Sequence, residues 1–197
     1  FVEIVTFRDY AYDDGQSHAA VTVPELSGSD AADEVSDQVQ AYTDQLIEQF
    51  QADREAAGKG HVGLDVSSTV VTDSDTWFTL RIDAVETQGG AMNLSKLYHI
   101  DKATGEVVTL SGLFQADADY VGVLSAEVAR QMEEKMAQDS SVVYFTDGFT
   151  AIDPEQDFYW DEDGDLVLVF GEYTLAPGYM GMQEFVIPQD VYSDMLA

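Results

Sequence analysis

The sequence predicts an α+β fold in which an antiparallel sheet carries two main helices on one face, with room for a division into two small lobes. Apolar residues recur with the helical period in two long segments, and with a period of two in the segments between and after them. The 197 residues are enough for one sizeable domain, and a hydrophobic fraction of 45% predicts a packed core. The chain has no cysteine, which excludes disulfides and thiolate chemistry.

The N-terminal part is expected to be a lobe of strands followed by a long helix. The first 25 residues are expected to be extended, in a strand that ends at Pro24. A helix capped by Ser29 or Asp30 should follow, and Gly58 and Gly60 should end it. Its buried face is formed by Val35, Val39, Tyr42, Leu46 and Phe50. We therefore expect an N-terminal lobe at residues 1–58 and a C-terminal α+β domain at residues 59–197.

The remaining elements are predicted from changes in the spacing of apolar residues and from turn residues. Alternating apolar residues predict strands, and Asp163-Gly164 predicts a tight hairpin turn. The expected elements are strands at 62–66, 78–84, 98–100 and 107–110, a helix at 117–137, a hairpin of 158–160 with 166–170, a strand at 185–187 and a short helix at 188–195.

Charge is the most unusual property of the chain. Acidic residues outnumber basic ones by 38 to 8, and no Lys or Arg follows Lys135. A second stretch with only acidic charge runs from Asp9 to Asp53. Such a surface repels nucleic acid and anionic lipid, and it attracts a cationic partner with a salt-dependent rate. The alternative is that the charge only keeps the protein soluble and monomeric.

No catalytic, cofactor or metal motif stands out. The run Gly58-x-Gly60-x-x-Gly63 follows a helix and opens a strand, the reverse of the context that a dinucleotide site needs. The three histidines are far apart in the sequence, and no serine has a G-x-S-x-G context. We therefore expect no catalytic residues, no metal and no cofactor, which favours a binding module over an enzyme.

One acidic segment resembles a calcium loop in part. Asp161, Asp163 and Asp165 are followed by Glu172, but Leu166 stands where a calcium loop requires glycine. A hairpin turn with an acidic tip explains the pattern better, and loose calcium binding is left open.

The candidate binding residues in the last third of the chain are of two kinds: acidic residues, and tyrosines and a methionine with a large contact surface. The acids would steer a cationic partner, and the tyrosines and methionine would contact it. The alternative for residues 173–182 is a loop that packs over the sheet. The candidates are Asp153, Glu155, Asp157, Tyr159, Asp161, Glu162, Asp163, Asp165, Tyr173, Tyr179 and Met180.

Several runs of residues resemble a known family. They are Gln88-Gly89-Gly90-Ala91, Leu97 to Asp101, Thr104-Gly105-Glu106, Leu110 to Phe114, Phe158-Tyr159-Trp160, Leu166 to Phe170, Ala176-Pro177 and Phe185 to Pro188. Together with the 21–50 segment, they are similar to the extracellular domain of the lysozyme-sensing anti-sigma-V factors, the RsiV-like family. The same module also occurs beside peptidoglycan deacetylase domains.

The resemblance implies the sensor domain of a bacterial, membrane-anchored anti-sigma factor, located outside the cell and anchored by a segment that precedes it. In that family, lysozyme binding licenses the proteolysis that frees the sigma factor. The family's Gly-Gly-Ala is usually followed by His, where this chain has Met92. Gly89, Gly90 and Met92 therefore join the candidate binding residues. Lysozyme is cationic, which agrees with the charge argument.

Two other functions remain compatible with the sequence. A cell-wall glycan (peptidoglycan) binding module would use the same aromatic residues with little salt dependence. A halophilic soluble enzyme would share the acidic excess and would lose its fold in dilute buffer.

Overall fold

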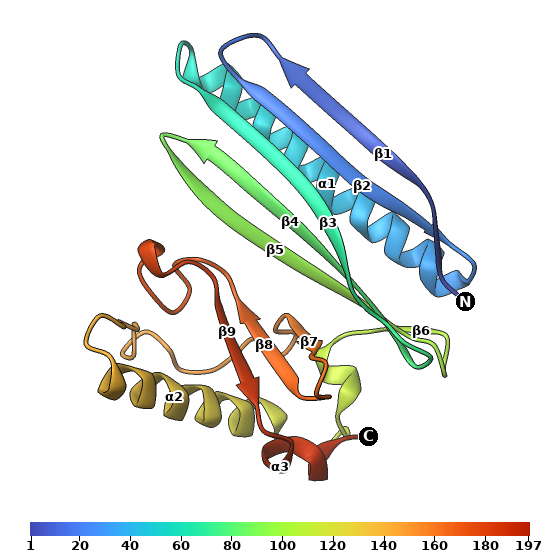
Figure 1. Ribbon diagram of the computed structural model, residues 1–197, viewed down its shortest axis with the longest axis vertical. Coiled ribbons are helices and arrows are strands. Elements are labelled where there is room, and N and C mark those ends of the chain that lie inside the picture. The colour runs from blue at the N-terminus through green and yellow to red at the C-terminus, as the bar shows by residue number, and fades with distance from the viewer. The chain divides into compact units, whose positions relative to one another are not determined.

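The computed structural model describes residues 1–197 and contains two compact units, Phe1–Val107 and Val108–Ala197 (Figure 1). Helices and strands are both well represented, which confirms the α+β prediction. The structure has the two lobes that the sequence leaves room for, and each unit has a sheet and a long helix of its own, so the two helices do not share one sheet. None of the helices is long and apolar enough to cross a membrane.

The first unit is a six-stranded sheet with one long helix. Its elements are β1 (Glu3–Asp13), β2 (His18–Ser27), α1 (Asp30–Ala57), β3 (Val62–Asp73), β4 (Trp77–Gln88), β5 (Gly90–Asp101) and β6 (Glu106–Val108). The strand order follows the sequence, β1-β2-β3-β4-β5-β6. The β1–β2, β3–β4 and β4–β5 pairs are antiparallel, whereas β2 and β3 are parallel.

The parallel β2–β3 pair changes the expected domain boundary. A parallel neighbour requires a crossover connection, and α1 supplies it. The strands on either side of this helix therefore belong to one sheet. As a result, the boundary expected after residue 58 falls inside the first unit, and the chain divides at Val107 instead.

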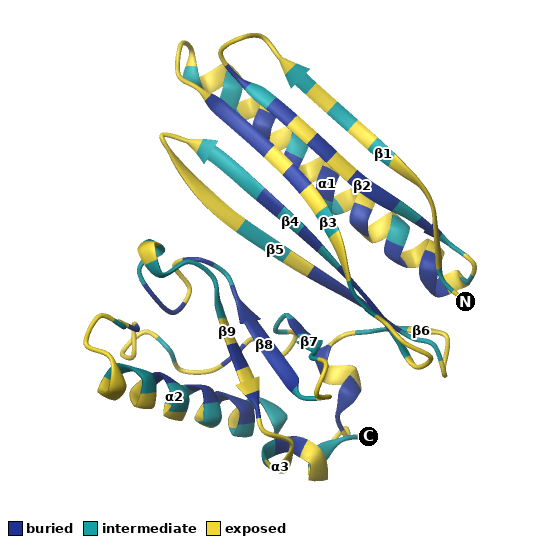
Figure 2. Ribbon diagram, viewed as in Figure 1, coloured by how far each residue is buried: buried dark blue, intermediate teal, exposed yellow.

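Helix α1 begins and ends where local chemistry predicts. The Ser29 side chain accepts a hydrogen bond from the backbone N–H of Ala32 at 3.2 Å, which caps the first turn. Gly58 ends the helix with a φ of 59°, a conformation that favours glycine. The buried face of α1 packs against β2 and β3, where exposed and buried residues alternate (Figures 1 and 2). The core includes Val35, Val39, Leu46, Phe50, Leu64, Leu80, Ile82 and Ile100.

Strand β2 is longer than expected. Pro24 was predicted to end it, but the strand continues to Ser27 and pairs with β1 along its whole length. Its pairing with β3 stops at Val21. Pro24 therefore lies where the strand has a neighbour on one side only, a position that tolerates a residue without an N–H.

The second unit is a three-stranded antiparallel sheet with a helix. Its elements are the 3-10 turn Leu110–Leu113, α2 (Tyr120–Gln138), β7 (Phe158–Trp160), β8 (Leu166–Phe170), the 3-10 turn Gly178–Met180, β9 (Gln183–Ile187), α3 (Gln189–Tyr192) and the 3-10 turn Ser193–Met195. Strand β8 lies between β7 and β9, and the predicted Asp163-Gly164 hairpin is confirmed. Every residue of β8 is buried, so both faces of this strand are covered (Figure 2).

Candidate functional site

The acidic turn between β7 and β8 uses part of its charge to hold its own backbone. Asp161 Oδ1 accepts hydrogen bonds from the backbone N–H of Asp163 at 3.0 Å and of Asp165 at 2.8 Å. Glu162 and Asp163 are exposed. No set of three or more acidic or histidine side chains is placed to hold a metal ion. The turn therefore exposes the charges of Glu162 and Asp163 to solvent, while the Asp161 side chain holds its backbone in place.

The neighbouring acids are also tied to the backbone. Asp153 Oδ1 accepts a hydrogen bond from the N–H of Glu155 at 2.8 Å, and Glu155 Oε1 accepts one from the N–H of Ser111 at 3.2 Å. Burial, followed by the charges of Glu155 and Asp153, raises the pKa of Tyr120. Asp153 and Glu155 remain exposed, so their charges still act on the surroundings.

The basic groups of the second unit do not neutralise these acids. Arg130 and Lys135 are the only Lys or Arg residues after Val108. Arg130 bonds to two carboxylates of its own helix, those of Glu127 at 2.8 Å and Glu134 at 2.9 Å. Lys135 Nζ lies 4.3 Å from the centroid of the Phe185 ring. The charge excess predicted after Lys135 is therefore uncompensated within this unit.

Residues 171–182, the aromatic loop, contain the most unusual backbone conformation of the chain. Tyr173 has a φ of 65° and is the only non-glycine residue with a positive φ. For a bulky residue this conformation is an outlier that is often found at functional sites. The Tyr173 ring lies so close to Gly178 that a Cβ atom at Gly178 would overlap it. Even so, 60% of Tyr173 is exposed.

The same loop is fixed to the unit by buried residues and hydrogen bonds. Leu175 and Ala176 are buried, and the Leu175 carbonyl accepts a hydrogen bond from the N–H of Phe145 at 2.7 Å. Tyr179 donates to the Ser141 carbonyl at 3.3 Å, yet 73% of its surface is exposed. The loop thus packs inward through its middle and displays Tyr173 and Tyr179 outward.

Four further candidates of the second unit are only partly exposed. Tyr159 is partly exposed and donates a hydrogen bond to Glu184 Oε2 at 3.0 Å. Met180 is partly exposed, and its sulfur accepts a hydrogen bond from the N–H of Val143 at 3.3 Å. Asp157 and Asp165 are also partly exposed, and the Asp157 carbonyl accepts a hydrogen bond from the N–H of Val169 at 2.9 Å. These four residues are therefore less exposed than Tyr173 and Tyr179.

The remaining candidates lie on the first unit. Gly89 forms the β4–β5 turn with a φ of 78°, which favours glycine. Gly90 and Met92 begin β5, where Met92 is 39% exposed and pairs directly with Glu86 of β4. The predicted binding residues therefore form two groups, one on each unit.

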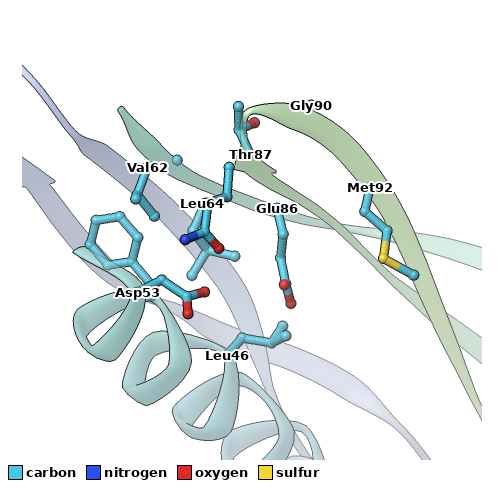
Figure 3. Close-up of a pocket in the computed structure, with 11 residues that line it drawn as sticks. Leu46, Asp53, Val62, Leu64, Glu86, Thr87, Gly90 and Met92 are labelled. Atoms are coloured by element: carbon cyan, nitrogen blue, oxygen red, sulfur yellow. The ribbon is translucent and has the colours of Figure 1, made fainter. Parts of the chain in front are cut away.

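Sequence reasoning missed a cavity next to this second group. It has a volume of about 190 Å³ and lies between the C-terminal half of α1 and strands β3 to β5 (Figure 3). The carboxylates of Asp53 and Glu86 both point into it. The sequence contains one indication of this pair. Asp53 follows Phe50 on the apolar face of α1, and Glu86 follows Ala84 in the alternating apolar positions of β4.

Part of the chain matches a family model, and its fold is similar to those of two solved structures. Residues 111–190 match the DUF3298 family, described as a protein of unknown function. A solved member of that family from Bacteroides fragilis NCTC 9343 has a TM-score of 0.66 at 16% identity, covering 100% of this chain and 93% of its own. A second, from Pseudomonas aeruginosa PAO1, has a TM-score of 0.70 at 15% identity, covering 100% and 94%. At these identities the likeness shows the fold alone.

Sequence similarity identifies the family more closely. The anti-sigma-V factor RsiV of Bacillus subtilis strain 168 is 32% identical over 203 residues, which cover 99% of this chain and 71% of that protein. The chain therefore belongs to the family of the anti-sigma-V factor RsiV, and the resemblance noted in the sequence is confirmed. The relative's name describes a regulator of a sigma factor rather than an enzyme.

Proposed function

We propose that this chain is the extracellular sensor domain of a membrane-anchored anti-sigma factor. It binds a cationic protein such as lysozyme through the acidic, aromatic-lined surface of its second unit. Membership of the RsiV family supports the regulatory role. The observation that carries the binding role is Tyr173, which is held exposed in a left-handed backbone conformation on an anchored loop.

The two kinds of residue have different tasks in this proposal. Exposed acids such as Glu162 and Asp163 raise the rate of encounter with a positively charged protein, and salt weakens this effect. Tyr173 and Tyr179 supply the contact energy, because large aromatic side chains dominate many protein interfaces. Their loop is anchored before binding, so little ordering is needed when the partner arrives.

The sequence offers no catalytic motif in a suitable context, and the relative of this chain is named as a factor that regulates a sigma factor. The proposal therefore includes no catalytic step and no cofactor.

A biosensor titration with egg-white lysozyme at low and high salt tests the proposal. We expect binding at low salt that weakens as salt rises, and no comparable binding of cytochrome c, a cationic protein of unrelated fold. Tyr179→Ala should weaken lysozyme binding by about 30-fold, the loss expected for an interface hot spot of about 2 kcal/mol. Phe7→Ala on β1 is the matched control, because Phe7 is also an exposed aromatic residue, at 52%.

Three results would contradict the proposal in different ways. Absence of lysozyme binding at low salt removes the lysozyme assignment. Equal binding of cytochrome c means that charge alone causes the association. Salt-independent binding of soluble muropeptides, without lysozyme binding, would assign the surface to a cell-wall glycan.

A further inference from the structure

The cavity of the first unit is lined by apolar side chains on most sides. The apolar lining consists of Leu46 and Phe50 of α1, Val62 and Leu64 of β3, and Met92 of β5. Figure 3 shows Leu46 on the helix side and Met92 on β5. Its volume of about 190 Å³ is several times the roughly 30 Å³ share of one water molecule, and it is below the range of about 300 to 1,000 Å³ typical of small-molecule pockets. The cavity therefore suits a single protein side chain.

Two carboxylates interrupt this apolar lining at positions that face the core. On α1, Asp53 follows Leu46 and Phe50 at helical spacing, on the same face of the helix. On β4, Glu86 continues the alternation of Phe78, Leu80, Ile82 and Ala84, all of which are buried. In Figure 3 both carboxylates point into the same cavity.

The protein provides no positive charge to this pair. None of the residues that line the cavity is Lys, Arg or His. The basic residues of the same elements have other partners. Arg54 of α1 lies 4.3 Å from the Tyr12 ring centroid, and Lys96 of β5 lies 4.9 Å from that of Tyr42. Arg81 of β4 pairs with Asp83 at 2.9 Å.

Hydrogen bonding satisfies only one member of the pair. Asp53 accepts one hydrogen bond, from Gln49 at 2.8 Å, whereas the Glu86 carboxylate has no hydrogen bond or ion pair within the protein. Burial, and after it the charge of Asp53, raises the pKa of Glu86. An acid left in this state favours any ligand that brings a cation to it.

We propose that this cavity receives one lysine or arginine side chain of the cationic protein partner, whose aliphatic stem packs on Leu46, Leu64 and Met92 while its charge lies between Asp53 and Glu86. The inference rests on the proposed function and assigns it a specific subsite. Charge complementarity selects a basic side chain, and the apolar walls match the stem of such a side chain.

An amine titration tests the cavity without any protein partner. We would follow ¹⁵N–¹H NMR spectra while adding n-pentylammonium, with 1-pentanol as the uncharged control of similar shape. We expect the amide signals of Gly63 and Gly90, which line the cavity, to shift at millimolar ammonium and not with pentanol. The shifts should vanish in the double variant Asp53→Asn/Glu86→Gln, whose spectrum also reports whether it is folded.

A second variant places a cation in the cavity from within the chain. Because Met92 pairs directly with Glu86, Met92→Lys puts an ammonium group beside the Glu86 carboxylate. It should abolish the pentylammonium shifts and raise the urea midpoint, whereas Met92→Leu should leave both unchanged. Equal shifts with pentanol, shifts that persist in the double variant, or no shift with the wild type would each overturn the inference.

Lysozyme affinity separates this inference from the proposed function. Glu86→Gln should weaken binding about tenfold, whereas Glu48→Gln, which removes the same charge from an exposed site on α1, should change it less than about twofold. If the wild type binds lysozyme and both variants bind equally well, the cavity proposal fails and the proposed function stands. If the wild type does not bind lysozyme, the proposed function fails, and the amine titration still decides whether the cavity accepts a basic group.

Discussion

The strain at Tyr173 can be measured by comparing two substitutions that both remove its ring. Tyr173 has a φ of 65°, where any residue with a Cβ atom is disfavoured by about 1 to 2 kcal/mol. Tyr173→Ala retains a Cβ atom and therefore the strain, whereas Tyr173→Gly removes both. The lost contact with Gly178 is the same in both variants, so it cancels in the comparison.

We therefore expect the glycine variant to be more stable than the alanine variant by about 1 kcal/mol. At an ordinary backbone position the order is the reverse, because glycine costs about 0.5 to 1 kcal/mol relative to alanine. For a unit the size of Val108–Ala197, 1 kcal/mol corresponds to about 4 to 8 °C in Tm.

Thermal and urea unfolding of the two variants, followed by circular dichroism, is the assay. An alanine variant as stable as the glycine variant, or more stable, would refute the strain argument. Lysozyme binding should fall by a similar factor in both variants, since both lack the exposed ring. A large difference in affinity between them would mean that the backbone conformation itself, rather than the ring, determines binding.

Three further predictions concern stability and pH, each measured by urea unfolding. Ser29→Ala should lower the unfolding free energy by about 1 kcal/mol by removing the α1 cap, while the exposed Ser67→Ala should change little. The pKa of Asp14 is lowered to about 2 by hydrogen bonds from the backbone N–H groups of Ser17 and Gln16 and, after them, from the Tyr12 hydroxyl. At pH values above 3.8, the usual pKa of this group, the ionised carboxylate therefore stabilises the folded state. Asp14→Asn should therefore be less stable than the wild type at pH 6, and the difference should vanish as the pH falls through about 2; a constant difference would contradict this. The pKa of Glu86 is raised above its usual value of 4.5, so ionisation of this carboxyl opposes folding. Glu86→Gln should therefore be more stable than the wild type at pH 7. This difference in unfolding free energy should shrink as the pH falls toward 4.5.

Most of the secondary structure could be predicted because local patterns determine it. The cap at Ser29, the glycine at the end of α1 and the Asp163-Gly164 turn all act within a few residues. The division into two units depended instead on a contact distant in sequence, the parallel pairing of His18–Val21 with Gly63–Val66. No local pattern predicts which strands pair across a 28-residue helix, so the expected boundary was misplaced.

The candidate sites were predicted to different extents for a similar reason. The excess of acids and the tyrosines of the aromatic loop are visible in the sequence, whereas the positive φ of Tyr173 is not. The Asp53 and Glu86 pair could not be anticipated, because the two residues come from separate elements and meet only once α1 packs on the sheet. The sequence does show that each of the two acids stands at the next position of an apolar stripe.

Hydrogen–deuterium exchange of the chain with and without egg-white lysozyme would locate the bound surface. If lysozyme binds the second unit as proposed, it should slow exchange in peptides covering residues 171–182 and the acidic turn at 161–165, and added salt should reverse the effect. Lysozyme-dependent protection confined to other segments, with the aromatic loop unchanged, would contradict the proposed binding surface.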